Sequence, residues 1–158
     1  MTSREDVARA MAFFEECDDI ALLHQLAGEV APRARKLVGQ FIGRGGEDSI
    51  PPPASLRPAR EPASRDDALR TLRQTNDFAL LQVLARSIGR RIEAIEIAAS
   101  AEFPVGARVT VPESGGYPPK GRQLQGTVES TGTSLQVLLD NGETWHGPPS
   151  LARRGGQS

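Results

Sequence analysis

Aromatic and basic side chains gather in two short segments in the last third of the chain. Tyr117 is followed by Lys120 and Arg122, and Trp145 is followed directly by His146. Exposed rings beside cations can stack on bases and meet phosphate, as in sites for single-stranded nucleic acid. The same residue types can instead line a groove for an extended peptide. A third interpretation, which we favour for Trp145, is that its ring packs into a core.

No group of residues in the sequence has the spacing of a known catalytic site. His24 stands alone on a predicted helix, where a surface or interface histidine is the commoner case. The sequence has no phosphate-binding loop, no Ser-His-Asp order and no Glu-x-x-His pair of the di-iron bundle type. The single cysteine, Cys17, excludes an internal disulfide and a thiolate metal site. We therefore expect no enzymatic activity, no cofactor, no metal site and no small-molecule substrate.

The composition is globular and nearly balanced in charge. The chain has 158 residues and a formal net charge of −1, and arginine supplies all but two of its 19 basic residues. Dedicated nucleic-acid binders usually carry a basic excess, because phosphate contacts supply most of their affinity. We attribute the arginine content to the GC-rich genome of a bacterium. No signal peptide and no apolar run of membrane-spanning length is present, so we expect a cytoplasmic protein without membrane contact.

One motif occurs twice in the first hundred residues. The sequence Asp-Ile-Ala-Leu-Leu at residues 19–23 returns as Asp-Phe-Ala-Leu-Leu at residues 77–81. Such self-similarity indicates that a unit of two helices was used twice, with the apolar faces of the two units buried against each other. We therefore predict one α-helical bundle built from two helical hairpins, at residues 1–46 and 64–101.

Polar residues mark where the predicted helices begin. Ser3 with Asp6, and Ser64 with Asp67, have the spacing of side-chain caps, and Asp18 or Asp19 can cap the second helix. The predicted helices span residues 3–16, 19–42, 64–74 and 77–100. The last helix carries one continuous apolar face, made by Phe78, Leu81, Leu84, Ile88, Ile92, Ile95 and Ala99.

Pro32 distinguishes the first hairpin from the second. A proline inside a helix removes one hydrogen bond and clashes with the carbonyl four residues earlier, here that of Gly28. We predict a kink or a break near Ala31, with helix resuming at Arg33. Since the second copy has no such interruption, the candidate surface for a partner is the region where the two copies differ, which contains Gly28, Pro32, Arg33 and Arg35.

Residues 47–63 form a proline-rich linker between the hairpins. Three consecutive prolines, Pro51 to Pro53, favour an extended polyproline conformation. Such a segment can be a ligand for an aromatic groove. We favour a spacer that lets the second hairpin fold back beside the first.

After Phe103 and Pro104 the apolar period changes from that of a helix to that of a strand. Strands are predicted at residues 105–111, 123–130, 135–139 and 144–146, with a turn and a last strand at 148–151. Asn141-Gly142 indicates a type I′ hairpin between the third and fourth strands. The chain is predicted to end in a loose tail at residues 154–158.

This part of the chain resembles a known small fold. The segments Val105-Gly106-Ala107-Arg108-Val109-Thr110-Val111, Gln125-Gly126-Thr127-Val128 and Val137-Leu138-Leu139-Asp140-Asn141-Gly142-Glu143 are similar to those of SH3-like barrels of the KOW or Tudor type. The resemblance implies a small SH3-like β-barrel at residues 102–153, and hence an α+β protein of two domains. Such barrels bind RNA, DNA, peptides or a neighbouring protein, and fold alone does not choose among these ligands.

Two modules without a catalytic site indicate a non-enzymatic interaction protein. The leading hypothesis is an adaptor or assembly protein, whose helical repeat docks a protein partner or a second copy of itself while the barrel supplies another contact. One alternative is an RNA-binding, DNA-binding or ribosome-associated factor that acts through the residues Tyr117, Lys120, Arg122, Trp145 and His146. Another is a small structural component of a phage-like or secretion assembly.

Overall fold

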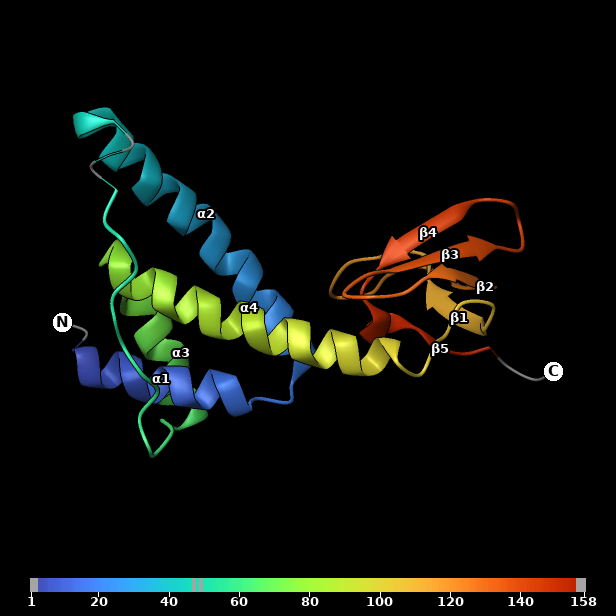
Figure 1. Cartoon of the computed structure of the whole chain (residues 1–158), viewed down its shortest axis with the longest axis horizontal. Coiled ribbons are helices and arrows are strands. Elements are labelled where there is room, and N and C mark those ends of the chain that lie inside the picture. Colours follow the sequence, from blue (N-terminus) through green and yellow to red (C-terminus); the bar gives the residue numbers. More distant parts are fainter. Residues whose placement is uncertain (1–2, 47, 49, 156–158) are drawn as a thin grey trace. The chain divides into compact units, whose positions relative to one another are not determined.

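The structure is a computed structural model of the chain, and it describes residues 3–46, 48 and 50–155. The described residues form α-helices in the N-terminal part and a five-stranded antiparallel sheet in the C-terminal part, as Figure 1 shows. The predicted α+β class is therefore confirmed. The chain divides into two compact units, Met1–Arg91 and Ile92–Ser158. We call them the helical unit and the sheet unit.

Side-chain caps begin all four long helices of the described chain. Helix α1 (Arg4–Glu16) starts with the predicted capping box, in which Ser3 Oγ accepts from the Asp6 N–H at 3.0 Å. Asp19 Oδ1 accepts from the Leu22 N–H at 3.1 Å and begins α2 (Ile20–Gly45). Helices α3 (Arg65–Gln74) and α4 (Phe78–Ser100) begin in the same way, after Ser64 and Asp77 respectively. The repeated Asp of the two motifs is therefore a helix cap.

Helix α2 continues through Pro32, so a break near Ala31 is wrong, while the alternative of a kink there stays a prediction. A proline costs the helix one hydrogen bond, but contacts on both sides of Pro32 hold the helix in place. Val30 is buried on one side. On the other, Arg33 Nη1 donates to the Leu72 carbonyl at 2.9 Å, and Arg33 Nη2 donates to the Thr75 carbonyl at 2.6 Å.

The helical unit has a core to which all four helices contribute. Ion pairs join neighbouring helices at the surface, Arg90 with Glu15 at 3.1 Å and Arg73 with Glu29 at 3.5 Å. The buried apolar residues are Val7, Ala10, Met11, Ala12, Phe14, Leu22, Leu23, Leu26, Val30, Ala63, Ala68, Leu72, Phe78, Leu80, Leu81, Val83, Leu84 and Ile88. Both leucines of each repeated motif are among them, so the motif specifies packing rather than chemistry.

The linker lies along the helices of its own unit. The N–H groups of Ala59 and Ala63 donate to the carbonyls of Ala8 and Arg9 in α1, each at 3.0 Å. The Ala54 N–H donates to the Ala79 carbonyl at 3.2 Å. Figure 1 shows this segment crossing from the end of α2 toward α3. The segment is thus held against its own unit, while its roles as a spacer and as a peptide ligand stay predictions.

The last turns of α4 differ from the predicted apolar face. Phe78, Leu81, Leu84 and Ile88 are buried as expected. Beyond Arg91, where the helix enters the sheet unit, the isoleucines of the predicted face are only half-buried. The most buried side chain there is Glu96, of which 2% is exposed.

The sheet unit has the strand order β4-β3-β2-β1-β5. Its strands are β1 (Arg108–Pro112), β2 (Gln123–Ser130), β3 (Leu135–Leu139), β4 (Thr144–Gly147) and β5 (Arg153–Arg154), with the short 3-10 helix η2 (Pro149–Leu151) before β5. The buried core comprises Phe103, Val109, Val111, Val128, Leu135, Val137, Leu139, Trp145 and Ala152.

Both ends of the sheet differ from the prediction. The first strand does not begin at Val105, which is 66% exposed, because Gly106 has a φ of +92° and a turn closes from the Ala107 N–H to the Pro104 carbonyl. The last strand comes later than predicted, since Arg153 and Arg154 pair with Thr110 and Val109 of β1. Arg154 is therefore not part of a loose tail, and residues 156–158 of that tail lie outside the described residues.

The hairpin between β3 and β4 is present, but its predicted turn type is wrong. A type I′ turn needs a positive φ at both central residues, and among the described residues only glycines have a positive φ. The Gly142 N–H donates to the Leu139 carbonyl at 2.9 Å, and Gly142 itself has a φ of +91°. This is the pattern of a three-residue loop that ends in a left-handed glycine.

Gly89 lies in the middle of α4 without a structural need for glycine. It is exposed, and a Cβ added there would meet nothing within 4 Å. Gly89→Ala is therefore expected to stabilise the helical unit by about 0.5–1 kcal/mol, because alanine loses less backbone entropy on folding. Urea unfolding followed by far-UV circular dichroism measures this. The matched variant Gly106→Ala should destabilise, since its φ is positive, and a lower stability of Gly89→Ala would contradict the expectation.

Candidate functional site

Trp145, one of the predicted binding residues, is a core residue of the sheet unit. It lies on β4 opposite Val137 of β3, and 4% of its surface is exposed. A Cβ added at Gly147 would come within 2.6 Å of its ring. The prediction of an exposed Trp145 that stacks on a ligand is therefore wrong, and Trp145 packs in the core, as in the interpretation that we favoured. His146, the next residue on the strand, is exposed opposite Gln136.

The predicted basic residues lie on the loop between β1 and β2. This loop is held as an extended hairpin, since the Glu113 N–H donates to the Arg122 carbonyl at 2.8 Å and the Ser114 N–H donates to the Lys120 carbonyl at 3.0 Å. The Arg122 N–H and guanidinium both approach the Glu113 carboxylate, at 3.2 and 3.9 Å. Glu113 therefore offsets the charge of Arg122, whereas Lys120 has no ion-pair partner in the described part of the chain.

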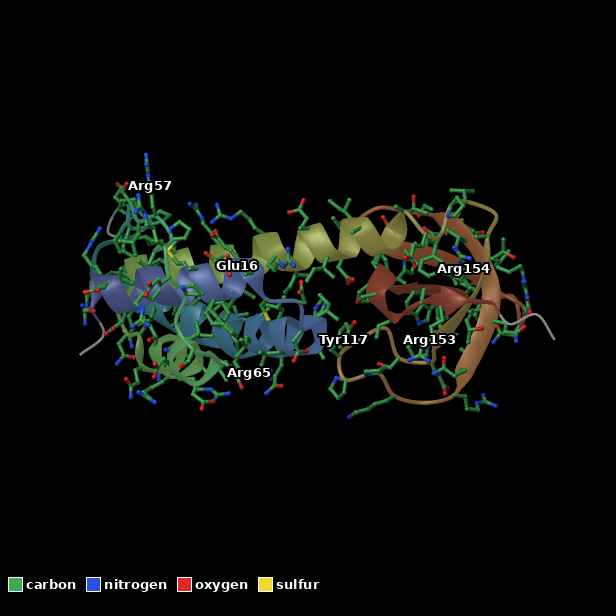
Figure 2. The ribbon with its side chains drawn as sticks, turned by 90° about the horizontal axis from the view of Figure 1, so that it is seen from below. Glu16, Arg57, Arg65, Tyr117, Arg153 and Arg154 are labelled. Atoms are coloured by element: carbon green, nitrogen blue, oxygen red, sulfur yellow. The ribbon has the colours of Figure 1, made fainter. Side chains whose placement is uncertain are left out.

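Tyr117 belongs to a polar network rather than to a basic surface. Its hydroxyl shares a hydrogen bond with Ser150 Oγ, which also donates to Glu96 Oε2 at 3.0 Å. The Ser150 N–H donates to Glu96 Oε1 at 2.9 Å. Figure 2 shows Tyr117 on its loop. The pKa of Tyr117 is raised, mainly by burial and further by the charge of Glu96, while the hydrogen bond with Ser150 opposes the rise.

This network joins three distant segments of the sheet unit. Glu96 comes from α4, Ser150 from η2, and Tyr117 from the loop between β1 and β2. A carboxylate that accepts two hydrogen bonds from one serine fixes that serine in place. Because its hydrogen bonds hold these three segments together, we assign the network a structural role. Sequence reasoning missed Glu96, and the available signal was a carboxylate on a helical face otherwise made of Ile92, Ile95 and Ala99.

An exposed ion pair spans the outer face of the sheet. Arg108 on β1 binds Asp140 through two parallel hydrogen bonds of 2.8 and 2.7 Å, and also donates to Thr127 Oγ1 at 3.1 Å. The pKa of Asp140 is lowered, mainly by the hydrogen bond from Arg108 and further by its charge. The pair therefore ties the β3–β4 hairpin to β1.

The contribution of this ion pair to stability should depend on pH. Because the pKa of Asp140 is lowered by folding, its stabilising effect is present above the ordinary carboxyl pKa and is lost as the pH falls through the folded-state value. An NMR titration of the Asp140 carboxyl should give a pKa below the usual range in the wild type. Arg108→Gln should return this pKa to the usual range, and Arg122→Gln should not change it. An unchanged Asp140 pKa in Arg108→Gln would contradict the assignment.

Charge is distributed unevenly between the two units. Residues 92–158 carry five basic and seven acidic residues, a net charge of −2, whereas residues 1–91 carry 14 basic and 13 acidic residues, a net charge of +1. Arg108 and Arg122 of the sheet unit are paired with acids. Acids therefore offset two of the five basic residues of the sheet unit, and its net negative charge disfavours phosphate binding.

The second half of α2 is the most unusual surface of the helical unit. We call residues 31–45 the α2 arm. Figure 1 shows this end of α2 (teal) extending away from the other helices of its unit. Ala34, Leu37, Val38, Phe41 and Ile42 continue the helical face of buried Val30. The first four are half-buried and Ile42 is 46% exposed, so the core leaves this apolar strip partly uncovered.

The α2 arm carries charge of one sign only. Arg33, Arg35, Lys36 and Arg44 lie on it, and residues 31–45 include no acid. At 100° per residue Arg35 and Arg44 border the apolar strip, and Lys36 lies on the far side. None of these three has an ion-pair partner among the described residues, whereas Arg33 donates to the α3 carbonyls. Among the predicted partner residues, Arg33 is therefore engaged inside the unit, while Gly28, Pro32 and Arg35 are exposed.

Comparison of the chain with known protein families, with characterised proteins and with solved structures finds no match. Within the described residues, no group of three or more side chains is placed to hold a metal ion. Nor does any helix of the described chain have the length and apolar character needed to cross a membrane.

Proposed function

We propose that the chain is a non-enzymatic interaction protein, whose helical unit docks an acidic protein partner along the α2 arm. One observation carries this proposal: the arm combines a partly uncovered apolar strip with unpaired cations and no acid. Amphipathic helices of this kind bind in apolar grooves of partner proteins, where the strip supplies affinity. The flanking charges then select a partner of opposite sign and speed the encounter.

The shape of the strip favours a protein over a membrane. A helix that inserts between lipids presents a broad apolar face with several exposed large side chains. On the α2 arm only Ile42 is largely exposed among the large apolar residues, and the Phe41 ring packs against Phe78 with centroids 5.8 Å apart. A shallow strip bordered by Arg35 and Arg44 fits a groove lined by carboxylates better than it fits a bilayer.

The sheet unit is proposed to be a separate SH3-like barrel domain that supplies a second contact. The strand order and the 3-10 turn before β5 support this fold. Nucleic-acid binding through this unit is the weaker proposal, because Trp145 is buried, Arg122 lies beside Glu113 and the unit is net acidic. Lys120 and His146 are the remaining exposed candidates.

The test is photo-crosslinking in cells of the source bacterium, with a photoreactive amino acid at position 42. Position 138 is the matched control, because Leu138 of the sheet unit is exposed to a similar extent, 43% against 46% for Ile42. We expect an acidic protein to be captured from position 42 and not from position 138. Once purified, this protein should bind the chain with an affinity that falls as salt rises, and R35E/R44E should weaken binding about tenfold or more.

Three outcomes would contradict the proposal. One is the absence of any captured protein at position 42. Another is capture that R35E/R44E leaves unchanged. The third is binding of the purified chain to phosphatidylglycerol vesicles that R35E/R44E abolishes, which would make a membrane the occupant of the α2 arm.

A further inference from the structure

The last turns of α4 carry a surface that is the counterpart of the α2 arm. We call residues 92–102 the α4 end. Ala94, Ile97, Ala98 and Ala101 have helical spacing on one face, and all four are exposed, Ile97 by 49%. This face is opposite to Glu96 and Ser100, which are buried. The sheet unit therefore leaves the apolar side of its own helix uncovered.

The α4 end is acidic where the α2 arm is basic. Glu93 borders Ile97 on the helix surface, and Glu102 follows the last turn; both are exposed. No basic residue occurs between residues 92 and 107. Neither Glu93 nor Glu102 has an ion-pair partner among the described residues. The two surfaces thus share an apolar strip and differ in the sign of the charges that border it.

Two identical α2 arms would not pair with each other, because the cations of one would face the cations of the other. Pairing of two α4 ends would likewise bring carboxylates together. Contact between an α2 arm and an α4 end places Arg35 and Arg44 beside Glu93 and Glu102, and Ile42 beside Ile97. Of the possible pairings of these two surfaces, only this one brings opposite charges together and covers both apolar strips.

We infer that the acidic partner of the α2 arm is the α4 end of a second copy of this chain. This inference rests on the proposed function and names its partner. The contact joins two different surfaces, so in a pair of copies one copy keeps a free α4 end and the other keeps a free α2 arm. Such head-to-tail contacts repeat, and they form a ring if the rotation closes and an open chain if it does not.

The inference is tested by sedimentation velocity of the purified full chain over a range of protein concentrations. At about 50 mM salt the wild type should form species larger than a dimer, and at about 500 mM salt it should shift toward the monomer. R35E/R44E makes both surfaces acidic, and E93K/E102K makes both surfaces basic. Each variant alone should therefore sediment as a monomer.

An equal mixture of the two variants is the decisive sample. In the mixture each reversed arm meets a reversed end of the other variant, so association should return to within about tenfold of the wild-type affinity. R57E/R153E is the matched control for R35E/R44E, because it makes the same change in net charge at two exposed arginines outside the α2 arm and the α4 end. Figure 2 shows Arg57 and Arg153. This control should associate like the wild type. Circular dichroism should show that all variants are folded.

A wild type that stays monomeric at every concentration would overturn the inference, as would a mixture of variants that fails to associate. A control variant that dissociates as readily as R35E/R44E would also overturn it. If one of these results is obtained but crosslinking at position 42 captures a different acidic protein, only the inference is wrong and the proposed function is retained. If crosslinking captures neither that protein nor a second copy, the proposed function fails as well.

Discussion

Glu96→Ala is expected to lower the free energy of unfolding of the sheet unit by about 2–4 kcal/mol. The carboxylate is 2% exposed, and it accepts hydrogen bonds from the N–H and the Oγ of Ser150. Removing it leaves both donors of Ser150 without their acceptor beside a new cavity. An unsatisfied buried donor costs about 1–3 kcal/mol, which is more than a typical hydrogen bond contributes.

The effect should depend on the carboxylate and extend to Tyr117. Glu96→Gln keeps one acceptor oxygen for the Ser150 N–H, so it should cost less than the alanine variant. Tyr117→Phe and Ser150→Ala should each destabilise the unit by about 1 kcal/mol, and together by less than their sum, because both remove the same hydrogen bond.

Urea unfolding followed by Trp145 fluorescence measures these changes, because the chain has one tryptophan and it lies in the core of the sheet unit. Glu143→Ala is the matched control: it removes a carboxylate from the sheet unit at an exposed position outside the α4 end. Its effect should stay within about 0.5 kcal/mol. Equal losses in Glu96→Ala and Glu143→Ala would mean that the network contributes nothing measurable.

Local signals predicted most of the fold because they act over a few residues. Ser3, Asp19, Ser64 and Asp77 cap their helices through hydrogen bonds to residues two or three positions later, so the sequence alone contains both partners. Strands β2 and β3 have the predicted bounds, since their alternation follows from one buried face.

The features that the sequence did not predict depend on distant partners. Pro32 remains inside a helix partly because Arg33 reaches carbonyls at Leu72 and Thr75. Glu96 is buried because Ser150, 54 residues later, supplies two donors. Neither partner can be recognised from local spacing. The sequence likewise did not show that the apolar strips of the α2 arm and the α4 end are left uncovered, because burial depends on how the helices pack.

Gly126→Ala is expected to destabilise the sheet unit strongly, with a loss of about 3 kcal/mol or more. Gly126 lies on the central strand β2, between Val109 of β1 and Leu139 of β3. A Cβ there would come within 2.5 Å of the Leu138 carbonyl oxygen and 2.7 Å of Val137 Cγ1. The first of these atoms belongs to the backbone, so no rotamer change can relieve the clash.

The clash can be relieved only if β2 and β3 move apart, which would disturb their hydrogen bonds and the core beneath them. Gly126→Ala should therefore lower the urea midpoint of the Trp145 transition and shift the amide NMR signals of both strands. Gly116→Ala is the matched control, because a Cβ at Gly116 meets only Ser114 Oγ, at 3.8 Å. It should change stability by less than about 0.5 kcal/mol. If Gly126→Ala were as stable as Gly116→Ala, the close approach of β3 to Gly126 would be wrong, and with it the register that places Gly126 opposite Leu139.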